Sequence, residues 1–264
     1  MLDVSVVVPA RNAAHWLDEC LASIVRNEPA ELIVVDGCSH DDTVAIAPRY
    51  GARVISDDGR GLSAARRLGA EAARHDRVAL VDADVVLGDG ALAALLDEFE
   101  EGGYTGLQAG LHSIGGPGYW GRALAHHHRT GRSVRWLGLV ATVFRRDALL
   151  AAGFDESFLS GEDIELRRRL RRAGARLGVS ERTVVLHRFA DGFPFARDQW
   201  LADGGGLART LRKEGLRGAG LLVLPALAAA RGIALCLARR ELRWIAYYAC
   251  YLVFNYAGMV RRRA

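Results

Sequence analysis

The clearest candidates for chemistry in this sequence are two carboxylates, Asp82 and Asp84, which bracket Ala83 directly after an apolar run. Hard divalent cations such as Mg²⁺ and Mn²⁺ need oxygen ligands and prefer one or two carboxylates together with substrate phosphates. A cation held here could neutralise a departing diphosphate as a Lewis acid. The alternative is a solvated turn with two incidental acids, and the Asp-x-Asp pattern alone does not decide between the two.

A second polar cluster covers residues 36–43, with the sequence Asp-Gly-Cys-Ser-His-Asp-Asp-Thr. Asp36 follows an apolar run, and its carboxylate could accept hydrogen bonds from the edge of a nucleobase. Ser39 or Asp41 can cap the helix that we expect next, because short polar side chains accept the free N–H groups of a first turn. Capping accounts for one of these two residues and leaves Asp36 unexplained.

The elements that would position these residues are short apolar strands that alternate with amphipathic helices. We expect strands at residues 4–8, 32–35, 53–56 and 78–81, and helices at residues 13–26, 43–50 and 62–74. This alternation predicts β-α-β units and a parallel sheet buried on both faces. Ligands of such sheets bind beyond the carboxyl ends of the strands, and each strand here is followed at once by polar residues. The predicted fold class is α/β, with a doubly wound, mostly parallel sheet flanked by helices.

The second half of the sequence is less regular. We expect a helix from near Ser160 through Arg172, ended by Gly174, and a strand at residues 183–186 that leads into His187. A flexible loop should follow, containing Trp200 and the three glycines at 204–206.

Five motifs in this order resemble those of the family-2 glycosyltransferases with the GT-A fold. They are the segments at residues 8–12 (VPARN), 35–43 (VDGCSHDDT), 61–69 (GLSAARRLG), 82–84 (DAD) and 161–163 (GED). The resemblance covers roughly residues 3–190, and five ordered motifs are more specific than any one of them. It implies a nucleotide diphosphate sugar as donor, a divalent cation (Mn²⁺ or Mg²⁺) as cofactor, and an inverting transfer to an acceptor hydroxyl.

The resemblance also implies roles for single residues. Pro9, Arg11 and Asp36 would hold the base and ribose, and Arg66 would reach the base or the diphosphate. Asp84 would be the chief metal ligand. The full set that we expect to bind the donor is Pro9, Arg11, Asp36, Ser39, Arg66 and Asp82.

By resemblance, Asp163 is the catalytic base that takes the proton from the acceptor hydroxyl while its oxygen attacks the sugar. The segment from Ser160 to Asp163 also fits a capping box, with Asp163 at the third helical position in place of the usual Glu or Gln. The two roles are compatible in part, because a helix N-terminus stabilises the ionised carboxylate that a base requires.

Two departures from the family pattern bear on function. Arg67 stands where the family usually has asparagine, so contacts around the sugar or phosphate could differ. The glutamine-plus-arginine-tryptophan signature of processive synthases is missing, and residues 198–200 (DQW) do not reproduce it. We therefore expect a single transfer per encounter.

Two sets of histidines could bind a metal. His187 would complete the metal site by resemblance, although a lone histidine is more often structural. His126, His127 and His128 cannot converge on one ion, because adjacent helical residues point about 100° apart. We expect these three to be surface or acceptor-side residues.

The charge of this 264-residue chain is divided unevenly along its length. Residues 205–264 carry an excess of +9, which leaves −5 for residues 1–204. The arginines of the basic part flank two apolar segments at residues 219–238 and 244–260 instead of alternating with exposed aromatics, which favours an anionic membrane surface over nucleic acid as partner. Each apolar segment is at or below the roughly 20 residues that a spanning helix needs.

These features predict a glycosyltransferase domain at residues 1–215 and a basic, apolar helical tail at residues 216–264. We expect the tail to contact the inner face of the cell membrane, with a lipid-linked or cell-envelope glycan as acceptor. The four cysteines are far apart, form no C-x-x-C pair and have no partner histidines at zinc spacing, so we expect reduced, packed thiols in a cytosol.

Two other functions remain open from the sequence. A nucleotide-sugar binding module without catalytic activity would use Asp163 only as a helix cap. A sugar nucleotidyltransferase would carry a glycine-rich, basic loop after its first strand, whereas this chain has Pro9-Ala10-Arg11-Asn12 there.

Overall fold

A computed structural model describes residues 1–131, 136–158 and 160–261 of the chain. The chain divides into two compact units, which we describe separately. Unit 1 comprises Met1–His112, Arg135–Ser157 and Leu166–His187, and unit 2 comprises Ser113–Val134, Phe158–Glu165 and Arg188–Ala264. The division expected at residue 215 stays a prediction about domains, and the compact units group the residues differently.

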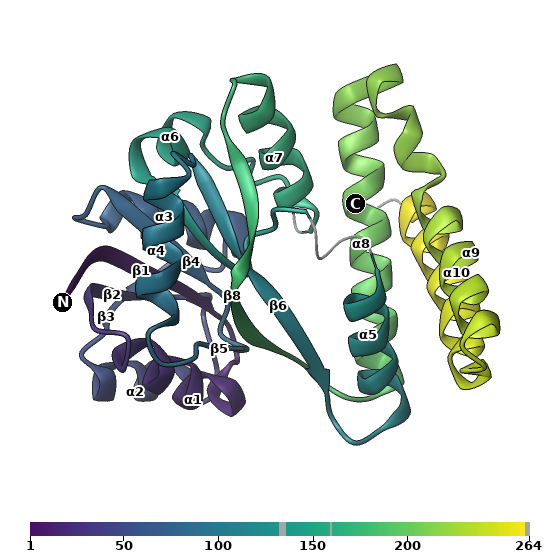
Figure 1. The fold of residues 1–264 in the computed structure, drawn as a ribbon, viewed down its shortest axis with the longest axis horizontal. Coiled ribbons are helices and arrows are strands. Elements are labelled where there is room, and N and C mark those ends of the chain that lie inside the picture. The colour runs from purple at the N-terminus through teal and green to yellow at the C-terminus, as the bar shows by residue number, and fades with distance from the viewer. Residues whose placement is uncertain (132–135, 159, 262–264) are drawn as a thin grey trace. The chain divides into compact units, whose positions relative to one another are not determined.

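A mixed sheet is the framework of unit 1 (Figure 1). Its strands within the described residues are β1 (Leu2–Ala10), β2 (Pro29–Asp36), β3 (Arg53–Ser56), β4 (Arg77–Val81), β5 (Val85–Val86), β6 (Gly106–Gly115), β7 (Ala141–Arg145) and β8 (Leu177–Phe189), in the order β3-β2-β1-β4-β7-β6-β8-β5. The first four strands pair in parallel, whereas the β4–β7, β6–β7 and β5–β8 pairs are antiparallel. The expected α/β sheet is confirmed, and its parallel part is the N-terminal half.

Helices cover both faces of this sheet. Successive apolar side chains of β1 point to opposite faces, and each face needs helices to bury them. Val4, Val6 and Val8 pack with α1 (Ala14–Val25) and α4 (Ala91–Glu101) on one face. Val7 packs on the other face with α3 (Leu62–Ala72), α6 (Arg146–Ala152) and the part of α7 (Glu162–Arg172) that belongs to unit 1. Helix α3 lies so close to β1 that a methyl group on Gly69 would lie 2.1 Å from Val7 Cγ1.

The expected elements of the first 81 residues are confirmed in type and order, although β1 and β2 extend beyond the expected residues 4–8 and 32–35 at both ends. The expected strand at residues 53–56 is β3, and the expected helix at residues 43–50 is α2 (Thr43–Ile46) followed by a 3₁₀ helix (Ala47–Tyr50). Strands buried on both faces of a sheet can be predicted from the sequence because they appear there as short continuous apolar runs.

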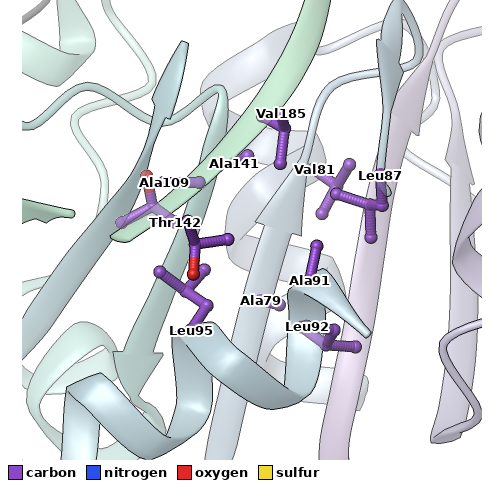
Figure 2. A pocket seen from close by; sticks show the side chains of 11 residues that line it. Ala79, Val81, Leu87, Ala91, Leu92, Leu95, Ala109, Ala141, Thr142 and Val185 are labelled. Carbon is purple, nitrogen blue, oxygen red and sulfur yellow. The ribbon is translucent and has the colours of Figure 1, made fainter. Parts of the chain in front are cut away.

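A cavity of about 10 Å³ lies in the apolar core of unit 1 (Figure 2). Side chains from β4, α4, β7 and β8 line it, among them Val81, Leu95, Ala141 and Val185. A cavity of this volume has room for one water molecule at most. The cavity is therefore a small packing defect and too small for a substrate.

Unit 2 is mainly helical and has an aromatic core (Figure 1). Its helices among the described residues are α5 (Tyr119–Thr130), α8 (Phe193–Glu214), α9 (Leu224–Ala238) and α10 (Ile245–Val260), with 3₁₀ helices at Gly215–Leu222 and Leu242–Trp244. Trp200, Tyr247 and Tyr248 are each 1% exposed. The Trp200 indole lies 5.2 Å from the Tyr247 ring in an edge-to-face contact, an arrangement favoured by the quadrupoles of aromatic rings.

The flexible loop expected at the three glycines is wrong, because residues 204–206 lie inside α8. A methyl group on Gly204 would lie 1.9 Å from the carbonyl oxygen of Asn255 on α10. One on Gly206 would lie 2.4 Å from the carbonyl oxygen of Ser160. Glycine is required here because the backbones of neighbouring segments approach too closely for a side chain. In the sequence alone, three consecutive glycines look like a flexible loop.

The Gly-Gly-Pro-Gly segment at residues 115–118 leads into α5, and Asp191 holds its end in place. The Asp191 carboxylate accepts hydrogen bonds from the backbone N–H groups of Gly118 and Gly121. Burial opposes ionisation of this carboxylate, but these N–H groups outweigh burial and lower its pKa. Asp191 therefore caps α5 from a distant part of the sequence, a role that sequence reasoning missed.

The expected packing of the cysteines holds for Cys20 and Cys236, which are buried, but not for Cys38, which is exposed. Cys20, Cys38, Cys236 and Cys250 are all free thiols in the structure.

Candidate active site

The loops after β1 and β2 are tied together by reciprocal hydrogen bonds. The backbone N–H of Asn12 donates to Ser39 Oγ at 2.9 Å, and the N–H of His40 donates to Asn12 Oδ1 at 2.9 Å. Asn12 adopts a positive φ of 49°, a conformation that asparagine tolerates better than most residues. Ser39, which we expected to bind the donor, thus shapes the loop itself.

Asp41 and Thr43 complete this connection at the start of α1. The Thr43 hydroxyl accepts the Ala13 N–H at 2.8 Å, and Asp41 Oδ2 accepts the Ala14 N–H at 3.1 Å. Asp41 Oδ1 also accepts the N–H of Thr43, the first residue of α2. One loop therefore caps two helices and fixes the carboxyl ends of β1 and β2, and the capping role considered for Asp41 is present.

Asp36 ends β2 beside Ala10, the last residue of β1. Its buried carboxylate accepts the Ser39 N–H at 3.2 Å and 3.3 Å through its two oxygens, which leaves lone pairs for a ligand. Pro9 is buried within β1, and the exposed Arg11 lies over Gly37, whose added methyl would be 3.1 Å from Arg11 Cβ. Asp36 and Arg11 thus reach one edge of the sheet, whereas Pro9 is part of its framework.

Arg66 on α3 holds the first carboxylate of the Asp-x-Asp turn. Its side chain is 3% exposed, and Nη2 donates to Asp82 Oδ1 at 2.7 Å. Burial raises the pKa of Asp82 to about 6, against the opposing charge of the Arg66 guanidinium. We expected Arg66 to contact the base or the diphosphate. In the structure it forms an ion pair with Asp82, which we expected to bind the donor as well.

Asp84 and His187 face each other across two paired strands. In the antiparallel β5–β8 pair, Val85 lies opposite His187, which brings the imidazole beside the turn that carries Asp84. His187 Nε2 lies 3.6 Å from Asp84 Oδ2. The two residues are about a hundred positions apart in the sequence, and only the sheet register brings them together.

This pair suits a divalent cation by its chemistry and spacing. Carboxylate oxygen and imidazole nitrogen are ligands of borderline cations such as Mn²⁺, and two donor atoms bound to one ion at about 2.1 Å lie roughly 3 to 4 Å apart. Within the described parts of the chain, no three His, Cys, Asp or Glu side chains form a metal-binding group. Phosphate oxygens and water would have to complete the coordination, as is usual for a metal that travels with a nucleotide.

Arg67, the departure from the family pattern, is paired with two acids. Its guanidinium donates to Glu156 and to Glu71 at 2.7 Å each. These hydrogen bonds raise the pKa of Arg67. The structure therefore gives Arg67 a role in joining α3 to the segment after α6.

Asp163 belongs to unit 2, whereas the residues above belong to unit 1. Helix α7 begins at Glu162, so Asp163 is its second residue and the expected third position is wrong by one. The helix has acids in its first turn and arginines in its last, which is favourable for the helix dipole. The Ser160 hydroxyl hydrogen-bonds the Asp203 carboxylate on α8, and the capping box stays a prediction.

Of the three consecutive histidines, His126 is buried and His127 and His128 are half-buried, so the expectation of a surface position is wrong for His126, while the acceptor-side alternative stays a prediction. The His126 ring stacks on Trp244 at 5.3 Å, and His127 lies among the rings of Tyr247, Tyr248 and Tyr251. Burial lowers the pKa of His127 to about 4. His128 lies 5.5 Å from the Phe189 ring, so all three imidazoles pack against aromatic side chains of unit 2.

Comparison with known proteins identifies a family. The model of the family named glycosyl transferase family 2 matches residues 5–158. An uncharacterised glycosyltransferase from Mycobacterium tuberculosis is 38% identical over 114 residues, which cover 41% of this chain and 51% of the relative. A 4,4'-diaponeurosporenoate glycosyltransferase from Staphylococcus aureus is 35% identical over 112 residues, 39% of this chain and 30% of the relative. The chain thus spans about half the length, or less, of these curated relatives.

A solved structure extends the likeness of the fold over nearly the whole chain. A mannosyltransferase from Pyrobaculum calidifontis, in complex with GDP-Man and Mn²⁺, superimposes with a TM-score of 0.67 at 17% identity. The match covers 98% of this chain and 87% of the other. Because the family model matches more than half of the residues and the GT-A-like fold agrees with it, this chain belongs to glycosyl transferase family 2.

Proposed function

We propose that this protein is an inverting, metal-dependent glycosyltransferase that moves a sugar from a nucleotide diphosphate sugar to an acceptor hydroxyl. The observation that carries the proposal is the gathering of Asp36, the Arg66–Asp82 pair and the Asp84–His187 pair beyond the strands of one sheet. Family membership supports the same activity. The Mn²⁺ in the mannosyltransferase structure supports a divalent cation.

The donor is held by unit 1 in this proposal. Asp36 accepts hydrogen bonds from the base or ribose, and Arg11 lies at the same edge of the sheet. Asp84 and His187 hold the cation, which supplies Lewis-acid stabilisation of the leaving diphosphate. Arg66 keeps the Asp82 side chain fixed beside them, so that the site is organised before the donor arrives.

Asp163 serves as the general base. Its carboxylate takes the proton of the acceptor hydroxyl while the acceptor oxygen forms a bond to the anomeric carbon. The bond from that carbon to the diphosphate oxygen breaks, and the nucleoside diphosphate leaves with the electron pair. The α7 N-terminus stabilises the ionised form of Asp163 that must exist before the acceptor binds.

The first test is thermal unfolding with a panel of nucleoside diphosphates and their sugars, with and without Mn²⁺. A nucleotide at 100 times its Kd should add about 2.7 kcal/mol of stability. The donor so found is then offered with candidate acceptors, and Asp163→Asn should abolish transfer while it keeps the metal-dependent stabilisation. A binding module without catalysis would be indifferent to Asp163→Asn, and the absence of any nucleotide effect would contradict the proposal.

We further propose that helices of unit 2 contact the anionic inner face of the cell membrane, where a lipid-linked or cell-envelope acceptor would be found. By length and composition, one stretch of the described residues, Phe193–Ala238, could cross a membrane, a criterion that core helices also meet. Only 28% of its most apolar window is buried. Leu216 is 95% exposed and Leu227 is 61% exposed, and Arg239, Arg240 and Arg243 follow.

Sedimentation with lipid vesicles tests this second proposal. The protein should bind phosphatidylglycerol vesicles and release at high salt, because screening weakens attraction between arginines and anionic headgroups. Leu227→Ser should weaken binding, whereas Val44→Ser, at an exposed apolar position of unit 1, should not. Equal binding to neutral phosphatidylcholine, or no effect of Leu227→Ser, would contradict the proposed surface.

A further inference from the structure

The loop between β3 and α3 is folded around the carboxylate of Asp57, a residue that is 1% exposed. Its Oδ1 accepts the N–H of Gly59 at 2.7 Å, and its Oδ2 accepts the N–H of Gly61 at 3.0 Å. The backbone carbonyl of Asp57 accepts the N–H and the Nε of Arg60 at 3.1 Å and 3.0 Å. Asp57 therefore holds the residues that follow it up to the start of α3.

The conformation of this loop needs such an anchor. Asp58, Gly59 and Gly61 have positive φ angles of 55°, 73° and 98°. This region is unfavourable for Asp58, and glycine is free to adopt many other conformations. The two carboxylate oxygens of Asp57 bind N–H groups of separate residues. They therefore select one loop shape among those that the two glycines allow.

The loop lies against the turn that carries Asp36. The N–H of Asp57 donates to the carbonyl oxygen of Asp36 at 3.0 Å. A methyl group on Gly59 would lie 3.7 Å from Cys38 Sγ. Cys38 precedes Ser39, whose N–H donates to the Asp36 carboxylate. The loop that Asp57 shapes is thus the neighbour of the carboxylate proposed for the base or ribose.

The metal half of the site has supports of its own. Helix α3 follows the loop, but it packs closely on β1 at Gly69, and Arg66 joins it to Asp82. The Asp-x-Asp turn leads into β5, which is paired with β8. Loss of the Asp57 carboxylate should therefore disturb the loop beside Asp36 and leave the carboxylates that face the cation in place.

We propose that Asp57 is a positioning residue of the donor site, which holds residues 57–61 in the shape that binds the base and ribose half of the donor. The proposal rests on the proposed function. Asp57 itself is buried and contacts no substrate. It acts by fixing the loop before the donor arrives, so that binding does not have to order two glycines.

The kinetic test compares the wild type with Asp57→Asn. The amide keeps one acceptor oxygen but lacks the second oxygen and the charge, so it holds the loop less firmly. The KM for the donor should rise about tenfold. The kcat should not change, because the lost interactions stabilise the bound donor and the transition state equally. An unchanged KM for the donor, or a lower kcat at unchanged KM, would overturn the proposal.

The matched control is Asp76→Asn, which removes an exposed carboxylate just before β4, at the opposite edge of the sheet. It should leave the KM for the donor unchanged. If it raises this KM as much as Asp57→Asn does, the effect is one of overall charge and the proposal is wrong.

A second variant, Gly59→Val, keeps the test decisive if Asp57→Asn does not fold. It disturbs the loop from its exposed side and leaves Asp57 in place, since a β-branched residue is strained at a positive φ. The KM for the donor should rise in this variant too. An unchanged KM would show that the shape of the loop does not matter for the donor.

A binding measurement separates the two halves of the donor. Titration calorimetry with Mn²⁺ compares a nucleoside diphosphate, with UDP and GDP tried first, and inorganic pyrophosphate, which has no base or ribose. Asp57→Asn should weaken binding of the nucleoside diphosphate about tenfold and leave that of pyrophosphate unchanged. An equal loss for both ligands would mean that Asp57 acts on the metal half of the site, which contradicts the proposal.

Hydrogen exchange distinguishes the failure of this inference from the failure of the proposed function. The amides of Gly59 and Gly61 should exchange faster in Asp57→Asn than in the wild type, with no ligand present. If they do but no nucleotide binds the wild type, Asp57 anchors the loop, and the inference falls together with the proposed function. If a nucleotide binds the wild type and Asp57→Asn with the same Kd, the proposed function stands and this inference is overturned.

Discussion

The two carboxylate pairs of this protein differ in what surrounds them. In unit 1, Asp82 is paired with Arg66 and Asp84 faces His187. In unit 2, Asp163 and Asp203 are accompanied by a third carboxylate, Glu162, and by a hydroxyl. Cationic neighbours favour the ionised form of a carboxylate and carboxylate neighbours favour its protonated form, although burial still raises the pKa of Asp82 to about 6. We propose metal binding for the carboxylates of unit 1 and proton transfer for Asp163 of unit 2.

The largest effect that the comparison predicts is at Asp84. Asp84→Ala should reduce the rate of transfer about a thousandfold, because a metal contributes several kcal/mol of transition-state stabilisation and each 1.36 kcal/mol is a factor of ten. Stabilisation by nucleotide and Mn²⁺ in thermal unfolding should disappear with it. Asp97→Ala, at an exposed position of α4, is the control. If the Asp84→Ala variant keeps the metal-dependent stabilisation, Asp84 does not bind the cation and the proposed metal site of unit 1 is wrong.

The next effect concerns the close contact between α8 and α10 in unit 2. Gly204→Ala should cost about 1 to 3 kcal/mol in the free energy of unfolding, because its methyl group meets the Asn255 carbonyl oxygen. Gly205→Ala, with nothing nearer than 3.8 Å, should stabilise α8 by about 0.5 to 1 kcal/mol. Urea unfolding measures both. Equal effects at the two positions would show that the α8–α10 contact is looser than the structure has it.

A smaller loss is expected for the carboxylate that caps α5. Asp191→Ala should cost about 2 kcal/mol, since the two backbone N–H groups lose a charged acceptor. Because the folded state lowers the pKa of Asp191, its contribution is present above about pH 4 and is lost as pH falls further. Unfolding of the variant measured at pH 7 and pH 3 should therefore approach that of the wild type at the lower pH. A constant difference would argue against a role for the charge.

The smallest effect is expected at Arg67. Arg67→Asn restores the residue that the family usually has and removes two partly exposed ion pairs, for a loss of about 0.5 to 1 kcal/mol. The KM for the donor should not change, because Arg67 is engaged with Glu71 and Glu156. A raised KM in steady-state kinetics would instead show that Arg67 contacts the donor, as one more donor-binding residue of unit 1.

The sequence predicted single residues of the candidate site, but it did not predict which of these residues contact one another. Asp36, Asp82 and Asp84 were found because each follows a buried strand, and parallel strands end at one edge of a sheet. The contacts of Arg66 with Asp82 and of Asp84 with His187 depend on strand register and helix packing, which local patterns do not encode. Asp203 was missed because an aspartate before three glycines looks like part of a loop.

The sequence by itself determined the α/β class, the order of elements through residue 81, the family and the short polar segments that carry chemistry. Apolar strands and amphipathic helices have local periods, and these periods suffice to recognise them. Only the tertiary structure decided that the glycines of α8 are packing contacts, that the three histidines of α5 pack against aromatic rings, and which carboxylates have cations or other carboxylates as neighbours. Those properties depend on residues far apart in the chain, and a side chain's pKa and burial are set by the groups that folding brings beside it.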